Sequence, residues 1–239
     1  MNQLRPFMED FSYERFQLTI EEVLECIDTA VAEGTPYSLA RFGHAEIAEL
    51  QVIPEFYRGM EYYRKYNGIT RRDLRDELLV AFKSCTTAGL LLTTVDASGA
   101  EHSRQSFLSL ELEFYTICSA WVTHHMVRLP YFWDWIRPYR LVLVGRRAAE
   151  AAPIFASKGI NVVDTMMLSD YEQLEQVYLQ LCRVGGWDIA LIAAGVPATL
   201  LAPRLANATG KVAIDFGHAL DLIIDGEDFD FEGLVKKLR

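Results

Sequence analysis

The second half of the chain alternates between short apolar runs and segments of helical character. The apolar runs occupy residues 140–145, 159–165, 188–194 and 211–216. Continuous runs of this length are typical of parallel strands that are buried on both faces. Helices are expected between them, over residues 147–157, 171–184 and 197–206. This alternation predicts a mostly parallel, Rossmann-like sheet flanked by helices.

The first half of the chain has a similar rhythm. Residues 19–33 form an amphipathic pattern, and Thr19 and Glu22 have the spacing of a capping box at the start of a helix. Strands are expected at 37–41 and 89–94, and helices at 71–83 and 106–118. No Gly/Ser-rich linker separates the halves. We therefore expect one α/β domain over residues 1–239, with an N-terminal part (1–136) and a Rossmann-like C-terminal part (137–239).

Composition and charge exclude some classes of protein. Hydrophobic residues make up 51% of the chain, which is enough for a sizeable core, and the formal net charge is −10. Nucleic acid is not an expected partner, because binding it requires basic patches. The sequence shows no signal-peptide pattern and no apolar run long enough to span a bilayer. We expect a cytoplasmic protein, with peripheral membrane attachment and a homodimer through the aromatic segment 121–135 left open.

Three polar segments follow predicted strands. They are residues 41–46 (RFGHAE), 195–199 (GVPAT) and 215–221 (DFGHALD). Ligands of open α/β sheets bind at the carboxyl ends of the strands. We therefore expect the three segments to face one crevice.

Each segment offers a different chemical group. His44 and Glu46 pair an imidazole with a carboxylate, which suits a metal such as Mn²⁺, although Glu46 equally suits the first turn of a helix. Gly195 permits a close turn, and Pro197 favours a helix start whose free amides attract a diphosphate. His218 has the chemistry to bind a phosphate, ligate a metal or move a proton.

A fourth segment, Gly145-Arg146-Arg147, places two cations at the start of a predicted helix. The helix dipole disfavours cations there, and a nearby anion would remove the conflict. Contact with a phosphate is one interpretation, and exposure to solvent is the other.

The three polar segments resemble the motifs of the GT-D-type glycosyltransferases. In that family a strand leads into R-F-G-D-G-E, whose Asp and Glu bind a metal, and residues 38–46 (SLARFGHAE) are similar to it. Residues 194–202 (AGVPATLLA) are similar to the family's G-P-T-A-T-x-L-A run, and residues 214–218 (IDFGH) to its I-D-x-G-H segment. The motifs occur in the family's order and span most of the chain.

This resemblance implies a single GT-D-type domain that transfers a sugar from a nucleoside diphosphate, with UDP favoured, to a glycan or glycoprotein hydroxyl. It implies that His44 and Glu46 hold the metal. His44 replaces the family's Asp and removes one negative charge, which favours Mn²⁺ over Mg²⁺. The expected catalytic residues are Glu46, Asp215 and His218, with Asp221 as a further candidate base. The expected donor- and phosphate-binding residues are Arg41, Gly43, Gly195, Pro197 and Thr199.

Other classes remain open at the level of the sequence. A Rossmann-type methyltransferase is one, although the turn after residues 140–145 offers only Gly145 where a glycine-rich loop would be expected. A non-catalytic nucleotide-sugar-binding subunit would follow if His44 abolished metal binding. A metal-dependent hydrolase would be expected to carry more histidine and aspartate ligands.

Overall fold

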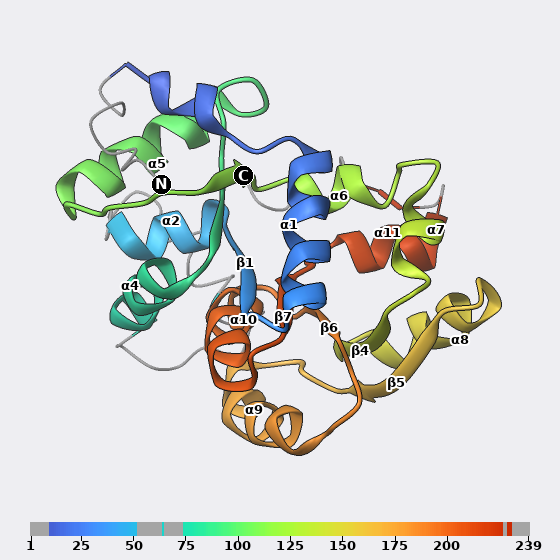
Figure 1. Ribbon diagram of the computed structural model, residues 1–239. Helices are drawn as coiled ribbons and strands as arrows, with labels where there is room; N and C mark the ends of the chain where they lie inside the picture. The colour runs from blue at the N-terminus through green and yellow to red at the C-terminus, as the bar shows by residue number, and fades with distance from the viewer. Residues whose placement is uncertain (1–9, 52–63, 65–73, 227–228, 231–239) are drawn as a thin grey trace.

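A single sheet of seven parallel strands forms the centre of the protein (Figure 1). The computed structural model describes residues 10–51, 64, 74–226 and 229–230. Within them the strand order is β3-β2-β1-β7-β6-β4-β5. The strands are β1 (Tyr37–Phe42), β2 (Thr87–Leu90), β3 (Ile117–Ser119), β4 (Arg140–Gly145), β5 (Asn161–Met166), β6 (Ile189–Ala193) and β7 (Val212–Asp215). The predicted parallel α/β architecture is confirmed.

Helices cover both faces of the sheet (Figure 1). One face carries α1 (Ile20–Glu33), α6 (Val122–Met126), α7 (Phe132–Ile136), α8 (Ala148–Ser157) and α11 (Ala219–Asp225). The other carries α2 (His44–Gln51), α4 (Leu74–Ser84), α5 (Ala97–Ser109), α9 (Leu174–Arg183) and α10 (Val196–Thr209). Short 3-10 turns lie at Ser12–Phe16 and Tyr171–Gln173. Among the described helices, none has the length and apolar character needed to cross a membrane.

The alternation of side chains along each strand explains why both faces are covered. Leu39 and Leu141 belong to the core beneath α1 and α8. Their neighbours Ala40 and Val142 belong to the core beneath α4 and α10. Successive side chains of a strand point to opposite faces, so a continuous apolar run supplies both cores at once.

Helix α1 forms as its sequence predicts. The Thr19 side chain accepts a hydrogen bond from the Glu22 amide at 3.2 Å, and the Glu22 carboxylate accepts one from the Thr19 amide at 2.7 Å. This capping box satisfies two amides that a helix start leaves without partners. The helix ends at Glu33 and is capped by Gly34, whose φ of 64° suits a residue without a side chain.

The helix predicted over 106–118 is wrong. Helix α5 runs from Ala97 to Ser109, and Ile117–Ser119 forms strand β3, which pairs with β2. The start signal of α5 is Asp96, whose carboxylate accepts a hydrogen bond from the Gly99 amide at 2.9 Å. Strand β2 also begins and ends earlier than predicted. Residues 71–73 of the helix predicted at 71–83 lie outside the described residues.

The aromatic segment 121–135 contributes mainly to the core. Phe132 is fully buried, and Trp133 packs edge-on against Phe155 with ring centroids 5.4 Å apart. The Trp135 indole donates a hydrogen bond to Asp28 at 2.7 Å. These contacts explain the segment's composition by packing within one chain, and the homodimer stays a prediction.

Candidate functional site

A cleft runs across the carboxyl ends of the strands. The loops that follow β1, β3, β4, β5, β6 and β7 all contribute to its lining. The cleft brings together the three polar segments that the sequence placed at strand ends, through Arg41, Gly43, His44, Glu46, Gly195, Asp215, His218 and Asp221. Trp121 and His124 line it as well, and the sequence pattern assigned neither of them to the site.

An ion pair between neighbouring strands lies beneath this cleft. Arg41 is the penultimate residue of β1, and Asp215 ends the adjacent β7. The Arg41 guanidinium donates to Asp215 Oδ1 from Nε at 3.2 Å and to the Ala120 carbonyl from Nη1 at 3.2 Å. The Arg41 amide lies 3.3 Å from Asp215 Oδ2. The Asp215 side chain is only 2% exposed, so the chain places a buried carboxylate beside a cation that neutralises it.

Thr199 connects this ion pair to Glu46. Its hydroxyl oxygen lies 3.0 Å from Asp215 Oδ2, 3.1 Å from the Arg41 carbonyl oxygen and 3.4 Å from Glu46 Oε1. A hydroxyl carries one hydrogen and can donate to only one of these acceptors. The conflict eases when Glu46 is protonated, because its own O–H can then donate to Thr199. Glu46 also accepts a hydrogen bond from the Gly43 amide at 3.0 Å.

The surroundings of Glu46 favour this protonated form. Burial, and next the charge of Asp215, raise the pKa of Glu46 to about 7. Burial raises the pKa of Asp215 too, while the charge of Arg41 opposes that shift. The two buried carboxyl groups thus share one nearby cation and retain a proton at a pH where exposed carboxyl groups have lost theirs.

His44 and Glu46, the predicted metal ligands, have different partners. His44 Nε2 lies 2.6 Å from Asp96 Oδ2 at the start of α5, whereas Glu46 is directed to Gly43 and Thr199. Partial burial tends to raise the pKa of Asp96. The hydrogen bonds from Gly99 and His44 outweigh this effect and hold that pKa below its usual value. No three His, Cys, Asp or Glu side chains gather as metal ligands in the described part of the chain. A cation here would need other ligands, and the metal site stays a prediction.

The start of α10 opens into the cleft. Gly195 precedes the helix with φ 62° and ψ −141°, a conformation that favours glycine, and Pro197 lies in the first turn. Among the described residues no side chain caps this helix start. The Thr199 side chain is fully buried and turned towards Asp215. The amides of this turn are therefore better placed for a phosphate than the Thr199 hydroxyl, and both assignments stay predictions.

Gly217 has no side chain, and this leaves room for the Arg41 guanidinium. Its φ is +50°, and a Cβ at this position would lie 1.7 Å from Arg41 Nη2. We expect Gly217→Ala to lower the free energy of unfolding by about 2 kcal/mol, because it strains the backbone and displaces the guanidinium. Urea unfolding measures this. Gly185→Ala is the matched control, since a Cβ there meets no atom within 4 Å. Equal stability of the two variants would contradict the expectation.

Comparisons with known proteins agree with this architecture. A solved structure of the domain of unknown function 1792 aligns over 95% of this chain and 87% of its own, with a TM-score of 0.60 and 15% sequence identity. A second, reported as showing that this domain has a distinct glycosyltransferase fold, aligns with a TM-score of 0.57 and 14% identity over 95% and 87% of the two chains. A third, described as a new glycosyltransferase from Streptococcus sanguinis, aligns with a TM-score of 0.54 and 14% identity over 89% and 85%.

At sequence identities this low, structural similarity shows a shared fold alone. No curated protein matches the chain in sequence. The family model described as the GT-D fold-like domain matches residues 18–223, which include all three polar segments of the cleft. The chain therefore belongs to the GT-D-like family.

Proposed function

We propose that this protein is a glycosyltransferase, which moves a sugar from a nucleoside diphosphate to an acceptor hydroxyl. The observation that carries the proposal is the buried network of Arg41, Asp215, Thr199 and Glu46 beneath a cleft at the strand ends of a GT-D-like domain. Two structures that share the fold are described as having a glycosyltransferase fold or as a glycosyltransferase. A strand-end cleft is also where α/β folds generally bind nucleotides.

The chemistry requires stabilisation of a leaving diphosphate. When the bond from the anomeric carbon to the diphosphate oxygen breaks, its electron pair stays on the diphosphate. The amides at the start of α10 supply positive potential in the cleft, and the Arg41 guanidinium lines the cleft as the partner of Asp215. Positive groups held in place by the fold favour the charge-separated transition state, because they do not have to reorganise during the reaction.

A base is needed to take the proton of the acceptor hydroxyl. Of the predicted candidates, Asp215 is buried and paired with Arg41, and Glu46 is buried against Thr199. The His218 side chain is 35% exposed and lines the cleft. Accessibility therefore favours His218 as the base, and it assigns Glu46 and Asp215 to holding the site in shape.

Metal assistance is part of the proposal, with Mn²⁺ preferred to Mg²⁺. A bound divalent cation would neutralise the diphosphate. His44 and Glu46 stay the predicted ligands, and to hold the cation they would have to exchange their present contacts with Asp96 and Thr199 for it. Cations of this kind often take one or two protein ligands and complete their coordination with substrate phosphates and water. That pattern suits a site without three gathered side-chain ligands.

The proposed donor is a UDP-sugar and the proposed acceptor a glycan or glycoprotein hydroxyl. Nucleic acid is not a proposed partner, because the net charge of −10 would repel it. A cytoplasmic location, with or without peripheral attachment to a membrane, completes the proposal.

Thermal unfolding in the presence of nucleoside diphosphates tests the function. We expect UDP with Mn²⁺ to raise the unfolding midpoint more than UDP or Mn²⁺ alone. A ligand at a hundredfold excess over its Kd stabilises the native state by about 2.7 kcal/mol. Stabilisation by UDP without metal would keep the donor site and remove the metal from the proposal. Stabilisation by S-adenosylmethionine and by no diphosphate would replace the transferase with a methyltransferase.

A further inference from the structure

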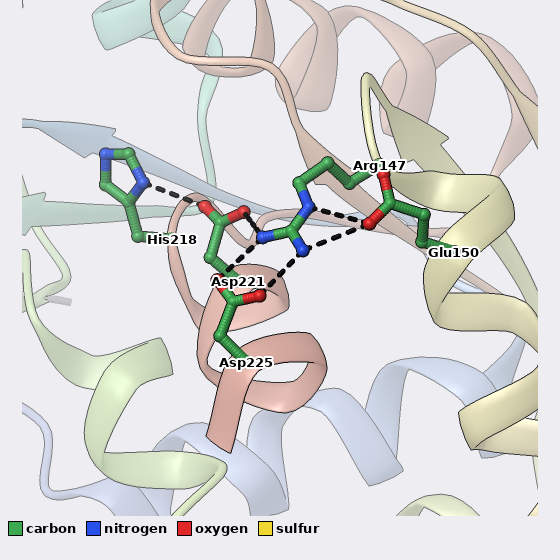
Figure 2. A network of polar contacts seen from close by, with 5 residues as sticks. All are labelled: Arg147, Glu150, His218, Asp221 and Asp225. Atoms are coloured by element: carbon green, nitrogen blue, oxygen red, sulfur yellow. Dashed lines mark hydrogen bonds and ion pairs between the residues drawn. The ribbon is translucent and has the colours of Figure 1, made fainter. Parts of the chain in front are cut away.

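Arg147 is enclosed by carboxylates at one wall of the cleft (Figure 2). Its side chain meets Asp225 at 2.7 Å through both Nη atoms and Asp221 at 3.0 Å through Nη1. Glu150 lies 3.1 Å from Nε and 3.0 Å from Nη2. A guanidinium has five N–H donors, and these five contacts use all of them. The chain itself thus supplies the anion expected beside this arginine, in place of a phosphate.

Asp221 and Asp225 make different use of Arg147. Asp225 directs both carboxylate oxygens at the guanidinium, which is enough to join α11 to the start of α8. Asp221 directs only Oδ1 at it, and its Oδ2 lies 3.0 Å from His218 Nδ1. Figure 2 shows the resulting chain of contacts from Arg147 through Asp221 to the imidazole. Asp221 therefore has a second partner that a purely structural contact between the helices would not need.

The contact with Asp221 determines which nitrogen of His218 carries the proton. An ionised carboxylate only accepts hydrogen bonds, so Nδ1 must donate and must carry the hydrogen. Neutral imidazole has one N–H, which leaves Nε2 with its lone pair. Nε2 lies on the side of the ring away from the Arg147 network in Figure 2, and the ring lines the cleft. Within the described part of the chain, Nε2 makes no hydrogen bond.

Carboxylates predominate in the network that His218 contacts. Glu150, Asp221 and Asp225 outnumber the single cation Arg147, so the network is negative overall. The nearest imidazole, His124, has its ring centroid 6.4 Å away. Burial, followed by the charge of Arg41, lowers the pKa of His124 to about 2, so that ring stays neutral. The aromatic ring of Phe229, at 6.5 Å, adds no charge.

We propose that Asp221 is a positioning residue that fixes His218 in the Nδ1–H tautomer, and that Arg147 in turn fixes Asp221. His218 Nε2 then receives the proton of the acceptor hydroxyl. The acceptor oxygen bonds to the anomeric carbon, and the bond from that carbon to the diphosphate breaks with its electron pair on the diphosphate. This inference rests on the proposed glycosyltransferase function for its chemistry, and on the Arg147–Asp221–His218 contacts for its geometry.

Nitrogen NMR of the full chain, labelled with ¹⁵N-histidine, tests the tautomer. His218→Gln identifies the His218 signals by their loss. At a pH where His218 is neutral, we expect a protonated Nδ1 and a bare Nε2. Asp221→Asn should keep this tautomer, because the amide oxygen can still accept from Nδ1. Asp221→Leu should move the proton to Nε2.

Asp225→Asn is the matched control, because Asp225 bonds to Arg147 but not to His218. It should leave the tautomer unchanged. An Nε2–H tautomer in the wild-type protein would overturn the inference, as would an Asp221→Leu variant that is folded and keeps the Nδ1–H tautomer. The measurement needs no substrate, so its failure is distinguishable from a failure of UDP to bind.

Discussion

Replacing Arg41 by methionine is expected to lower the free energy of unfolding by about 3–5 kcal/mol, the range found when one partner of a buried ion pair is removed. The substitution keeps much of the side chain's apolar length but leaves Asp215, which is 2% exposed, without its cation. Burial raises the pKa of Glu46 and of Asp215, and the charge of Arg41 opposes both shifts. The loss should therefore grow as pH rises and the two carboxyl groups are forced to ionise together.

Urea unfolding at several pH values measures this effect. Arg137→Met is the matched control, because Arg137 pairs with Asp134 at the surface and both side chains are at least half exposed. Exposed ion pairs contribute less than about 1 kcal/mol. A loss of similar size in the two variants would show that Arg41 is not a buried charge of special importance. In a double-mutant cycle, Asp215→Leu should lower the free energy of unfolding less in the Arg41→Met variant than in the wild-type protein, because the two side chains interact directly.

The sheet was predictable because its strands carry their own signal. A strand such as Leu141–Val144 is buried on both faces, so every position in it must be apolar and the run stands out from its surroundings. The register between strands is not visible in the same way. Strand β3 has three residues, too few to show a period, and its partner is chosen by the surrounding packing. The helix α5 was misplaced because its signal is a cap, Asp96, rather than a stripe.

The same distinction applies to the site, where positions at strand ends were predictable and individual contacts were not. Arg41, Glu46 and Asp215 were predictable as members of one site, because the ends of parallel strands meet at one edge of a sheet. Which side chain bonds to which was not. Thr199 was assigned to a phosphate, whereas the structure turns its hydroxyl to Asp215, Arg41 and Glu46. Two of the three partners of Arg147, Asp221 and Asp225, lie more than seventy positions away in α11, and only the packing of α11 against α8 brings them to it.

Because the pKa of Glu46 is raised in the native state, this residue makes the free energy of unfolding depend on pH. Its pKa is about 7 in the folded chain, against a usual value of 4.5 for a glutamate in the unfolded chain. Below pH 4.5 both states hold the proton and Glu46 carries no penalty. Between the two values the unfolded chain loses the proton and the native state keeps it. The unfolded state then binds fewer protons, so the free energy of unfolding falls as pH rises, and the loss is complete above about pH 7.

Glu46→Gln should remove this penalty, because an amide of the same shape does not ionise. Relative to the variant, the wild-type protein should lose about 3 kcal/mol of stability between pH 4 and pH 8, since one pKa unit corresponds to about 1.4 kcal/mol. Urea unfolding of both proteins across this range measures the difference. Glu25→Gln, at an exposed position of α1, controls for the loss of one carboxylate anywhere in the chain. Stability curves that stay parallel for wild type and Glu46→Gln would mean that Glu46 is already ionised beside Asp215. Thr199 would then have to donate to one carboxylate and leave the other unsatisfied, and Arg41 alone would have to balance two buried charges.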